Sequence, residues 1–249
     1  MKIGLKLYST DTALIQDASR LGKGFFDFIE LYIIPSSYEK TINIWKSFDI
    51  PYVIHAPHSL HRVNLAQEDK WESNLKHFVE TRRFADELGS ETIIVHGGNN
   101  GSISETIRQI KLLNERRIAL ENKPKIGLQN ELCIGWSPPE FYEVFNAGVL
   151  DGMVLDFRHA ACAAYSLKVK EMEIIKSFMV FNPKLFHLSD GDVLSEKDIH
   201  LNLGKGNLNL AEFLSMVPHD GLLTVETPRD PSKGLDDFVN DVIFLRKIS

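Results

Sequence analysis

The stretch GMVLDFRH (residues 152–159) runs from a short apolar segment into an aspartate and a histidine. Apolar segments of this length are typical of strands that are buried on both faces, as in a parallel sheet. Seven further segments share this composition, and they span 2–8, 26–33, 52–57, 92–98, 125–132, 184–190 and 222–228. The sequence therefore predicts eight strands, and in 152–159 the ionisable residues fall where the strand ends.

Segments with helical periodicity separate these strands. In 70–89, apolar residues recur at helical spacing, at Trp71, Leu75, Phe78, Val79 and Phe84. Gly89 predicts the end of that helix. Ser102 followed by Glu105 is typical of a capping box, and the two prolines of SPPEFYEVF (137–145) suit a first helical turn. The chain thus alternates between strands and helices.

Eight strand-helix units with no internal linker predict an α/β fold, a single (β/α)8 barrel domain over residues 1–249. An open, doubly wound sheet is the structural alternative. It is disfavoured because the nucleotide fingerprint GxGxxG does not follow the first strand.

Composition and charge limit the class of protein. Hydrophobic residues make up 43% and charged residues 25% of the chain, as in a globular protein with a full core. The net charge of −6 neither supports nor excludes DNA binding, because bound cations would add positive charge locally. Cys133 and Cys162 form no CxxC pair, which argues against a thiolate zinc site. With no signal sequence and no apolar segment of membrane-spanning length, we expect a cytoplasmic protein that does not enter a membrane.

Ionisable residues of the metal-ligand type cluster at the ends of the predicted strands. In strand order they are His55, His96, Glu131, Asp156 with His159, His187 and Glu226, and Asp198 and His200 follow the seventh strand. The carboxyl ends of the strands meet at one rim of a barrel, so these nine side chains would converge. Buried imidazoles and carboxylates are readily satisfied by divalent cations. Histidine and carboxylate without cysteine suit zinc, manganese or iron, whereas magnesium alone would not favour so many imidazoles.

At these residues the sequence resembles the superfamily that joins the endonuclease IV enzymes (apurinic endonuclease family 2) to the xylose isomerase-like sugar isomerases and epimerases. The resemblance covers essentially the whole chain. It rests on HAP (55–57), VHGG (95–98), NEL (130–132), LDFRHA (155–160), HLSDGD (187–192), DIHLNLGKG (198–206) and VETP (225–228). Each motif is weak alone, but their order on successive strands is specific.

The endonuclease branch implies up to three zinc ions. By this resemblance His55, His96 and Glu131 hold the first, and Glu131 bridges to a second held by Asp156, His187 and Glu226. The third is held by His159, Asp198 and His200. Such a cluster suits phosphoester hydrolysis, because it can generate hydroxide at neutral pH and neutralise the leaving alkoxide. We therefore expect a metal-dependent hydrolase of phosphodiesters.

The sugar isomerase branch is the second interpretation. It implies one divalent ion, held at Glu131, Asp156, His187 and Glu226, with Glu131 and Glu226 as the acid and base of proton transfer. This interpretation leaves five of the nine predicted ligands without a metal role. A third interpretation, a barrel that binds ligands but has lost catalysis, is disfavoured because every ligand position keeps its residue type.

The resemblance admits two classes of substrate. Abasic DNA and a smaller sugar phosphate are both expected candidates. Phe157 and Arg158 stand where the endonucleases typically have a Thr-Cys pair. His58 stands where that family has an aromatic residue, just after the histidine of the third strand. Arg158 and Arg229 adjoin predicted ligands, so each is a candidate for binding a substrate phosphate, or for pairing with a nearby carboxylate.

Overall fold

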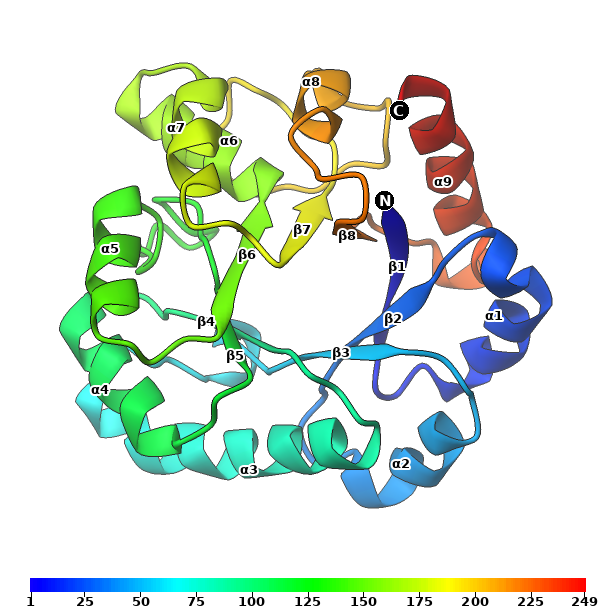
Figure 1. Ribbon diagram of the computed structural model, residues 1–249, viewed down its shortest axis with the longest axis horizontal. Helices are drawn as coiled ribbons and strands as arrows, with labels where there is room; N and C mark the ends of the chain where they lie inside the picture. Colours follow the sequence, from blue (N-terminus) through cyan, green and yellow to red (C-terminus); the bar gives the residue numbers. More distant parts are fainter.

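The computed structural model describes residues 1–249, apart from the side chain of Lys23. Its centre is a closed barrel of parallel strands in chain order, with β8 lying beside β1 (Figure 1). The strands are β1 (Lys2–Tyr8), β2 (Phe28–Tyr32), β3 (Tyr52–His55), β4 (Ile93–His96), β5 (Ile118–Glu121), β6 (Gly152–Asp156), β7 (Leu185–Leu188) and β8 (Leu222–Val225). The predicted (β/α)8 barrel is confirmed.

Helices surround the barrel on its outside (Figure 1). They are α1 (Ile15–Leu21), α2 (Tyr38–Lys46), α3 (Trp71–Glu87), α4 (Ile103–Leu113), α5 (Pro138–Asn146), α6 (Phe157–Leu167), α7 (Glu171–Met179), α8 (Leu210–Leu214) and α9 (Asp236–Ile248). The main apolar core joins strand residues such as Leu5 and Ile54 to helix residues such as Phe84 and Phe141. Within the described part of the chain, no helix is both long and apolar enough to cross a bilayer.

The predicted helix boundaries are confirmed at three places. Gly89, just beyond α3, has a φ of 63°, a conformation that glycine adopts without steric cost. The Ser102 side chain accepts the backbone N–H of Glu105 at the start of α4 (3.2 Å). At the start of α5 the Glu140 carboxylate accepts the backbone N–H of Ser137 (3.2 Å). These contacts satisfy N–H groups that a helix leaves unpaired in its first turn.

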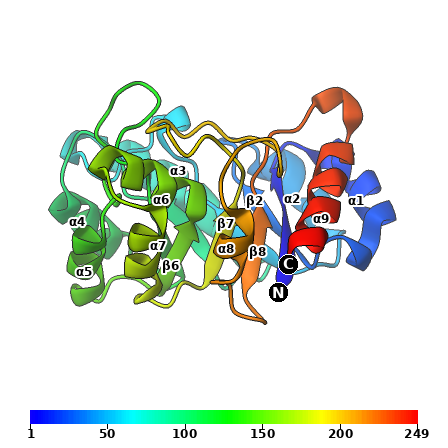
Figure 2. The same cartoon turned by 90° about the horizontal axis from the view of Figure 1, so that it is seen from above.

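The interior of the barrel changes from apolar to polar along the strands. One interior cluster is apolar and consists of Phe28, Val53, Ile94, Ala119, Val154 and Leu185. Two residues further along the same strands stand Glu30, His55, His96, Glu121, Asp156 and His187. Because side chains alternate between the faces of a strand, the second set occupies the next interior layer. This polar layer lies at the carboxyl ends of the strands, and the loops after β5 and β7 project from that end (Figure 2).

The predicted fifth strand, at 125–132, is wrong. The fifth strand is β5, which pairs with β4 and β6. Residues 125–132 instead form a turn beyond β5, where the Gly127 N–H donates to the carbonyl oxygen of Glu131 (2.9 Å) and Asn130 has a φ of 65°. This left-handed residue reverses the chain, so the segment cannot continue as a strand.

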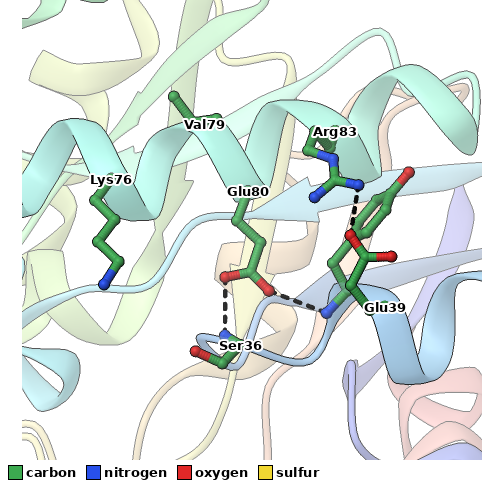
Figure 3. Close-up of a pocket in the computed structure, with 7 residues that line it drawn as sticks. Ser36, Glu39, Lys76, Val79, Glu80 and Arg83 are labelled. Atoms are coloured by element: carbon green, nitrogen blue, oxygen red, sulfur yellow. Dashed lines mark hydrogen bonds and ion pairs between the residues drawn. The ribbon is translucent and has the colours of Figure 1, made fainter.

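A surface hollow of about 340 Å³ lies between α2 and α3 (Figure 3). Glu80 reaches across it from α3 and accepts the backbone N–H groups of Ser36 and Tyr38 (2.8 and 3.0 Å). Arg83 pairs with Glu39 at 2.7 Å. These contacts satisfy the first turn of α2, so the hollow belongs to the packing of the two helices.

Candidate metal centre

Nine ionisable side chains converge on the polar end of the barrel. Six come from strands or their ends, namely His55, His96, Glu121, Asp156, His187 and Glu226, and three come from α6 and the loop after β7, namely His159, Asp198 and His200. The structure thus brings together all the predicted ligands except Glu131, and Glu121 stands in its place.

The first group consists of His55, His96 and Glu121. The Nε2 atoms of the two histidines lie 3.2 Å apart, and His96 Nε2 lies 3.0 Å from Glu121 Oε2. Ligands at zinc-bond distances are separated by roughly 3.3 Å in a tetrahedral site. The three side chains are therefore spaced as ligands of one cation.

The second group shares Glu121 with the first and adds Asp156, His187 and Glu226. His187 Nδ1 lies 2.9 Å from Glu226 Oε2, 3.6 Å from Glu121 Oε2 and 3.9 Å from Asp156 Oδ2. Three carboxylates thus surround one imidazole nitrogen. Because Glu121 belongs to both groups, its carboxylate could serve as a ligand in both.

The third group lies on the side of α6 and the loop after β7. Asp198 Oδ2 lies 3.0 Å from His159 Nε2, and Asp198 Oδ1 lies 3.0 Å from His200 Nε2. The ligand-type atoms of His159 and His200 also lie within 4.8 Å of one from Asp156. A third cation would have two imidazoles and one or two carboxylates available.

Four of these histidines are oriented through their second ring nitrogen. The acceptors are Glu30 Oε1 for His55 Nδ1 (2.8 Å), Glu30 Oε2 for His187 Nε2 (2.8 Å), Asn122 O for His159 Nδ1 (2.8 Å) and Glu226 O for His200 Nδ1 (2.7 Å). A neutral imidazole donates through one nitrogen only. Each of these rings would therefore present the lone pair of its other nitrogen to the centre, as metal-ligating histidines do.

Unsatisfied buried atoms support a metal-binding role for these residues. Asp156 Oδ2, His187 Nδ1, Asp198 Oδ1 and Glu226 Oε2 are buried and make no hydrogen bond of acceptable geometry with the described residues, although some of them lie near a histidine or a carboxylate. Each such atom costs about 1–3 kcal/mol if nothing compensates it. Divalent cations at the second and third groups would satisfy all four, and the mixture of imidazole and carboxylate fits zinc, manganese or iron.

The protonation states differ between the first and third groups. Burial, followed by the charge of Lys123, lowers the pKa of His96 to about 3, so this imidazole is neutral and ready to bind. Burial also opposes a charge on His200, but the Asp198 carboxylate raises the pKa of His200 to about 9. A cation at the third group must therefore displace a proton.

The fully buried side chain of Glu30 was not assigned a metal role from the sequence. Its two oxygens accept from His55 and His187, which belong to the first and second groups. One carboxylate thus orients ligands of two different groups. The signal for it is the polar residue in an otherwise apolar strand, two residues after the interior Phe28.

Replacing Glu30 by glutamine should weaken metal binding at the first two groups by about 10- to 100-fold, the usual effect of losing such a supporting partner. An amide cannot accept a hydrogen bond through both of its heavy atoms. Competition with a chromogenic chelator would measure each affinity, and the third group should keep its ion. Glu91→Gln, an exposed site next to β4, is the control. Unchanged affinities in Glu30→Gln would contradict the orienting role.

Lys6 places a positive charge at the floor of the site. Its ammonium lies 2.6 Å from Glu226 Oε1 and 3.2 Å from Glu30 Oε1. Burial opposes that charge, yet Glu226 and Glu30 raise the pKa of Lys6. The contact engages one oxygen of Glu226 and leaves Oε2 facing the second group.

Asp190 shapes the loop that carries Asp198 and His200. Its Oδ2 accepts the backbone N–H groups of Gly204 (3.0 Å) and Gly206 (2.9 Å). A Cβ at Gly206 would lie 2.3 Å from a backbone oxygen of the loop, so only glycine fits there. The glycines of DIHLNLGKG therefore fold the loop around Asp190.

Glu131 lies outside the three groups. Its carboxylate accepts the backbone N–H of Gln129 (2.8 Å) in the turn beyond β5. The expectation that it bridges two metals is corrected, because Glu131 does not end a strand. Glu121 does, and it follows the interior residue Ala119 by two positions.

The two predicted phosphate-binding arginines lie in different surroundings. Arg158 is fully buried, and its guanidinium donates to the carbonyl oxygens of Asp192 (2.8 Å) and Lys197 (2.6 Å). It therefore holds the loop after β7 and has no surface for a substrate phosphate, which corrects that prediction. Arg229 is partly exposed and donates to the Lys6 carbonyl oxygen and to Asp11 Oδ2 (3.3 Å). Its role as a phosphate ligand stays a prediction.

Known proteins of two activities resemble this chain. Over 211 residues it is 31% identical to a protein of Aquifex aeolicus (strain VF5) named "Probable endonuclease 4", covering 74% of this chain and 73% of that protein. Its fold is similar to endonuclease IV from Thermus thermophilus, with a TM-score of 0.71, 21% identity and coverage of 99% and 100%. A D-tagatose 3-epimerase-like protein is similar as well, with a TM-score of 0.75, 19% identity and coverage of 100% and 97%.

These two structural similarities establish the fold alone, since their sequence identities are low. The sequence model of one family extends over nearly the whole chain and matches residues 15–248. The protein therefore belongs to the xylose isomerase-like TIM barrel family and is related to endonuclease 4 proteins.

Proposed function

We propose that this protein is a metal-dependent phosphoester hydrolase of the endonuclease IV type, with three positions for divalent cations. The observation that carries the proposal is the third group, His159, Asp198 and His200. An isomerase with one metal needs only the four ligands of the second group. A third group with paired imidazoles and an unsatisfied Asp198 oxygen is unexplained by that chemistry.

The proposed ligand set follows the three groups. His55, His96 and Glu121 would hold the first cation, and Glu121 with Asp156, His187 and Glu226 the second. His159, Asp198 and His200 would hold the third. Such a cluster supplies a nucleophile at neutral pH and neutralises the leaving oxygen. Glu30 and Lys6 position ligands without themselves joining any of the three groups.

Exposed apolar side chains on the loops at the polar end favour a nucleic-acid substrate. Leu60, Leu128 and Leu194 are 78%, 63% and 68% exposed, and they follow β3, β5 and β7. Apolar side chains presented in this way can insert between bases. The departure at Phe157 does not argue against DNA, because Phe157 is buried and stacks on Phe186 and Phe213. Abasic DNA is thus the first substrate to test.

Zinc-loaded protein is expected to contain three ions per chain and to cleave a duplex beside an abasic site. Elemental analysis after gel filtration measures the zinc content. A gel assay with an end-labelled duplex measures cleavage beside the abasic site. Ketoses, ketose phosphates and simple phosphodiesters are assayed in parallel. One ion per chain together with isomerisation and no cleavage would overturn the proposal.

A sugar phosphate isomerase is the second candidate, favoured by the complete four-residue second group and by the epimerase-like fold. In that case Glu121 and Glu226 would exchange the proton, with Glu121 taking the role expected of Glu131. Against this stands Lys6, whose contact at 2.6 Å occupies one oxygen of Glu226.

A further inference from the structure

Lys123 is a basic residue at the metal centre without a protein partner. It follows Glu121 and Asn122 directly, and its backbone N–H is fixed by the carbonyl oxygen of Gly135 (2.9 Å). Its side chain is half-buried. Among the described residues, none lies within ion-pairing or hydrogen-bonding distance of its ammonium, which is open to solvent.

Lys123 directly follows two residues that contact histidines of the centre. Its neighbour Asn122 accepts from His159, and Glu121 contacts His96. His58, on the loop after β3, stacks on His96 with ring centroids 4.5 Å apart. After burial, the Lys123 charge is a cause of the lowered pKa of His96, and it acts in the same direction on His58 and His159. Lys123 therefore leaves the chain directly after residues that contact the first and the third group.

The other basic side chains near the site are engaged. Lys6 pairs with Glu226 and Glu30, and Arg158 holds backbone carbonyl groups. Lys197 donates to Gly127 O (2.7 Å) and to Asn130 Oδ1 (2.6 Å). The positive charges of these three side chains are therefore already paired with protein oxygens. Lys123 is the basic group near the centre that keeps its hydrogen-bonding capacity for a ligand.

We propose that Lys123 binds a phosphate group of the substrate, beside the first and third groups of the centre. Lysine is a common phosphate ligand and acts as a point charge that can follow the moving group. No carboxylate among the described residues pairs with this ammonium, so it is available to an anion from solution. The site would therefore select phosphorylated substrates over neutral sugars. The identity of the phosphate as a substrate ester rests on the proposed function, whereas the anion site itself does not.

The test uses inorganic phosphate as the probe and zinc-loaded protein throughout. Isothermal titration calorimetry compares wild type with Lys123→Met and Lys123→Arg. The matched control is Lys125→Met, since Lys125 lies two residues further on with its ammonium over the Trp136 ring (4.9 Å). We expect Lys123→Met to weaken phosphate binding at least about 10-fold, the size of one charge-assisted hydrogen bond. Lys123→Arg should retain most of the affinity, Lys125→Met all of it, and the zinc content should not change.

Failure of this inference and failure of the proposed function give different results. Equal phosphate affinity in wild type and Lys123→Met, at equal zinc content, would overturn the role of Lys123 even if an abasic duplex is cleaved. A 10-fold loss that Lys125→Met also produces would overturn it too. Selective loss in Lys123→Met supports the anion site, even when no phosphoester is hydrolysed.

Discussion

Replacing Glu121 by glutamine is expected to lower kcat/KM for phosphoester cleavage at least about a thousandfold, roughly 4 kcal/mol of transition-state stabilisation. The carboxylate of Glu121 belongs to the first and second groups together. Glutamine keeps the shape of the Glu121 side chain but lacks the negative charge that two cations would share. The zinc content should fall from three ions towards the single ion held by His159, Asp198 and His200.

The matched control for this variant is Glu131→Gln. It makes the same chemical change ten residues further along, in the turn beyond β5. We expect its kcat/KM and zinc content to stay within about twofold of wild type, because surface substitutions are usually nearly neutral. Circular dichroism would confirm that both variants fold. If Glu131→Gln lowered kcat/KM and zinc content as much as Glu121→Gln, Glu131 would again be the candidate for the ligand shared by two metals.

The positions of most candidate ligands could be predicted because they depend on local pattern. A short apolar strand that ends in histidine or a carboxylate places that side chain at the rim of any parallel barrel. His55, His96 and Asp156 each end a strand in this way. Knowing the strand was therefore enough to place the ligand.

Glu121 could not be found by the same reasoning, because β5 has a weak pattern. Ile118–Glu121 is four residues long, contains the helix formers alanine, leucine and glutamate, and follows α4 closely. The segment 125–132 has a similar apolar content, but Asn130 reverses its direction. What separates the two is the pairing of Ala119 with Ile94 in β4, a long-range contact that local pattern does not encode.

The supporting residues could not be predicted for a related reason. Lys6 of β1 meets Glu226 only because the barrel closes between β8 and β1, whereas Glu30 of β2 meets His55 because β2 pairs with β3. Arg158 lies next to candidate ligands in the sequence, whereas its guanidinium turns away to carbonyl groups 34 and 39 residues further on. Sequence proximity indicates the element, but not the direction of a long side chain.

Replacing His200 by alanine is expected to separate hydrolysis from isomerisation. The variant should lose the third cation, retain two, and cleave phosphoesters at least about 100-fold more slowly, since the cluster would lose one source of charge stabilisation. Isomerase turnover, if it is the native activity, should be unchanged because the second group is intact. Zinc content and both turnovers would be measured on the same preparation.

A second variant keeps this test interpretable, because His200 Nδ1 also donates to the carbonyl oxygen of Glu226 (2.7 Å) and its loss disturbs the end of β8. Asp198→Asn removes the charge of the third group and leaves that hydrogen bond in place, so it should reproduce the loss of the third ion and of hydrolysis. His219→Ala, at an exposed position before β8, is the control. Full phosphoester turnover in Asp198→Asn with two ions bound would mean that the third group has no part in the reaction. A phosphoester hydrolase would then be no better supported than an isomerase.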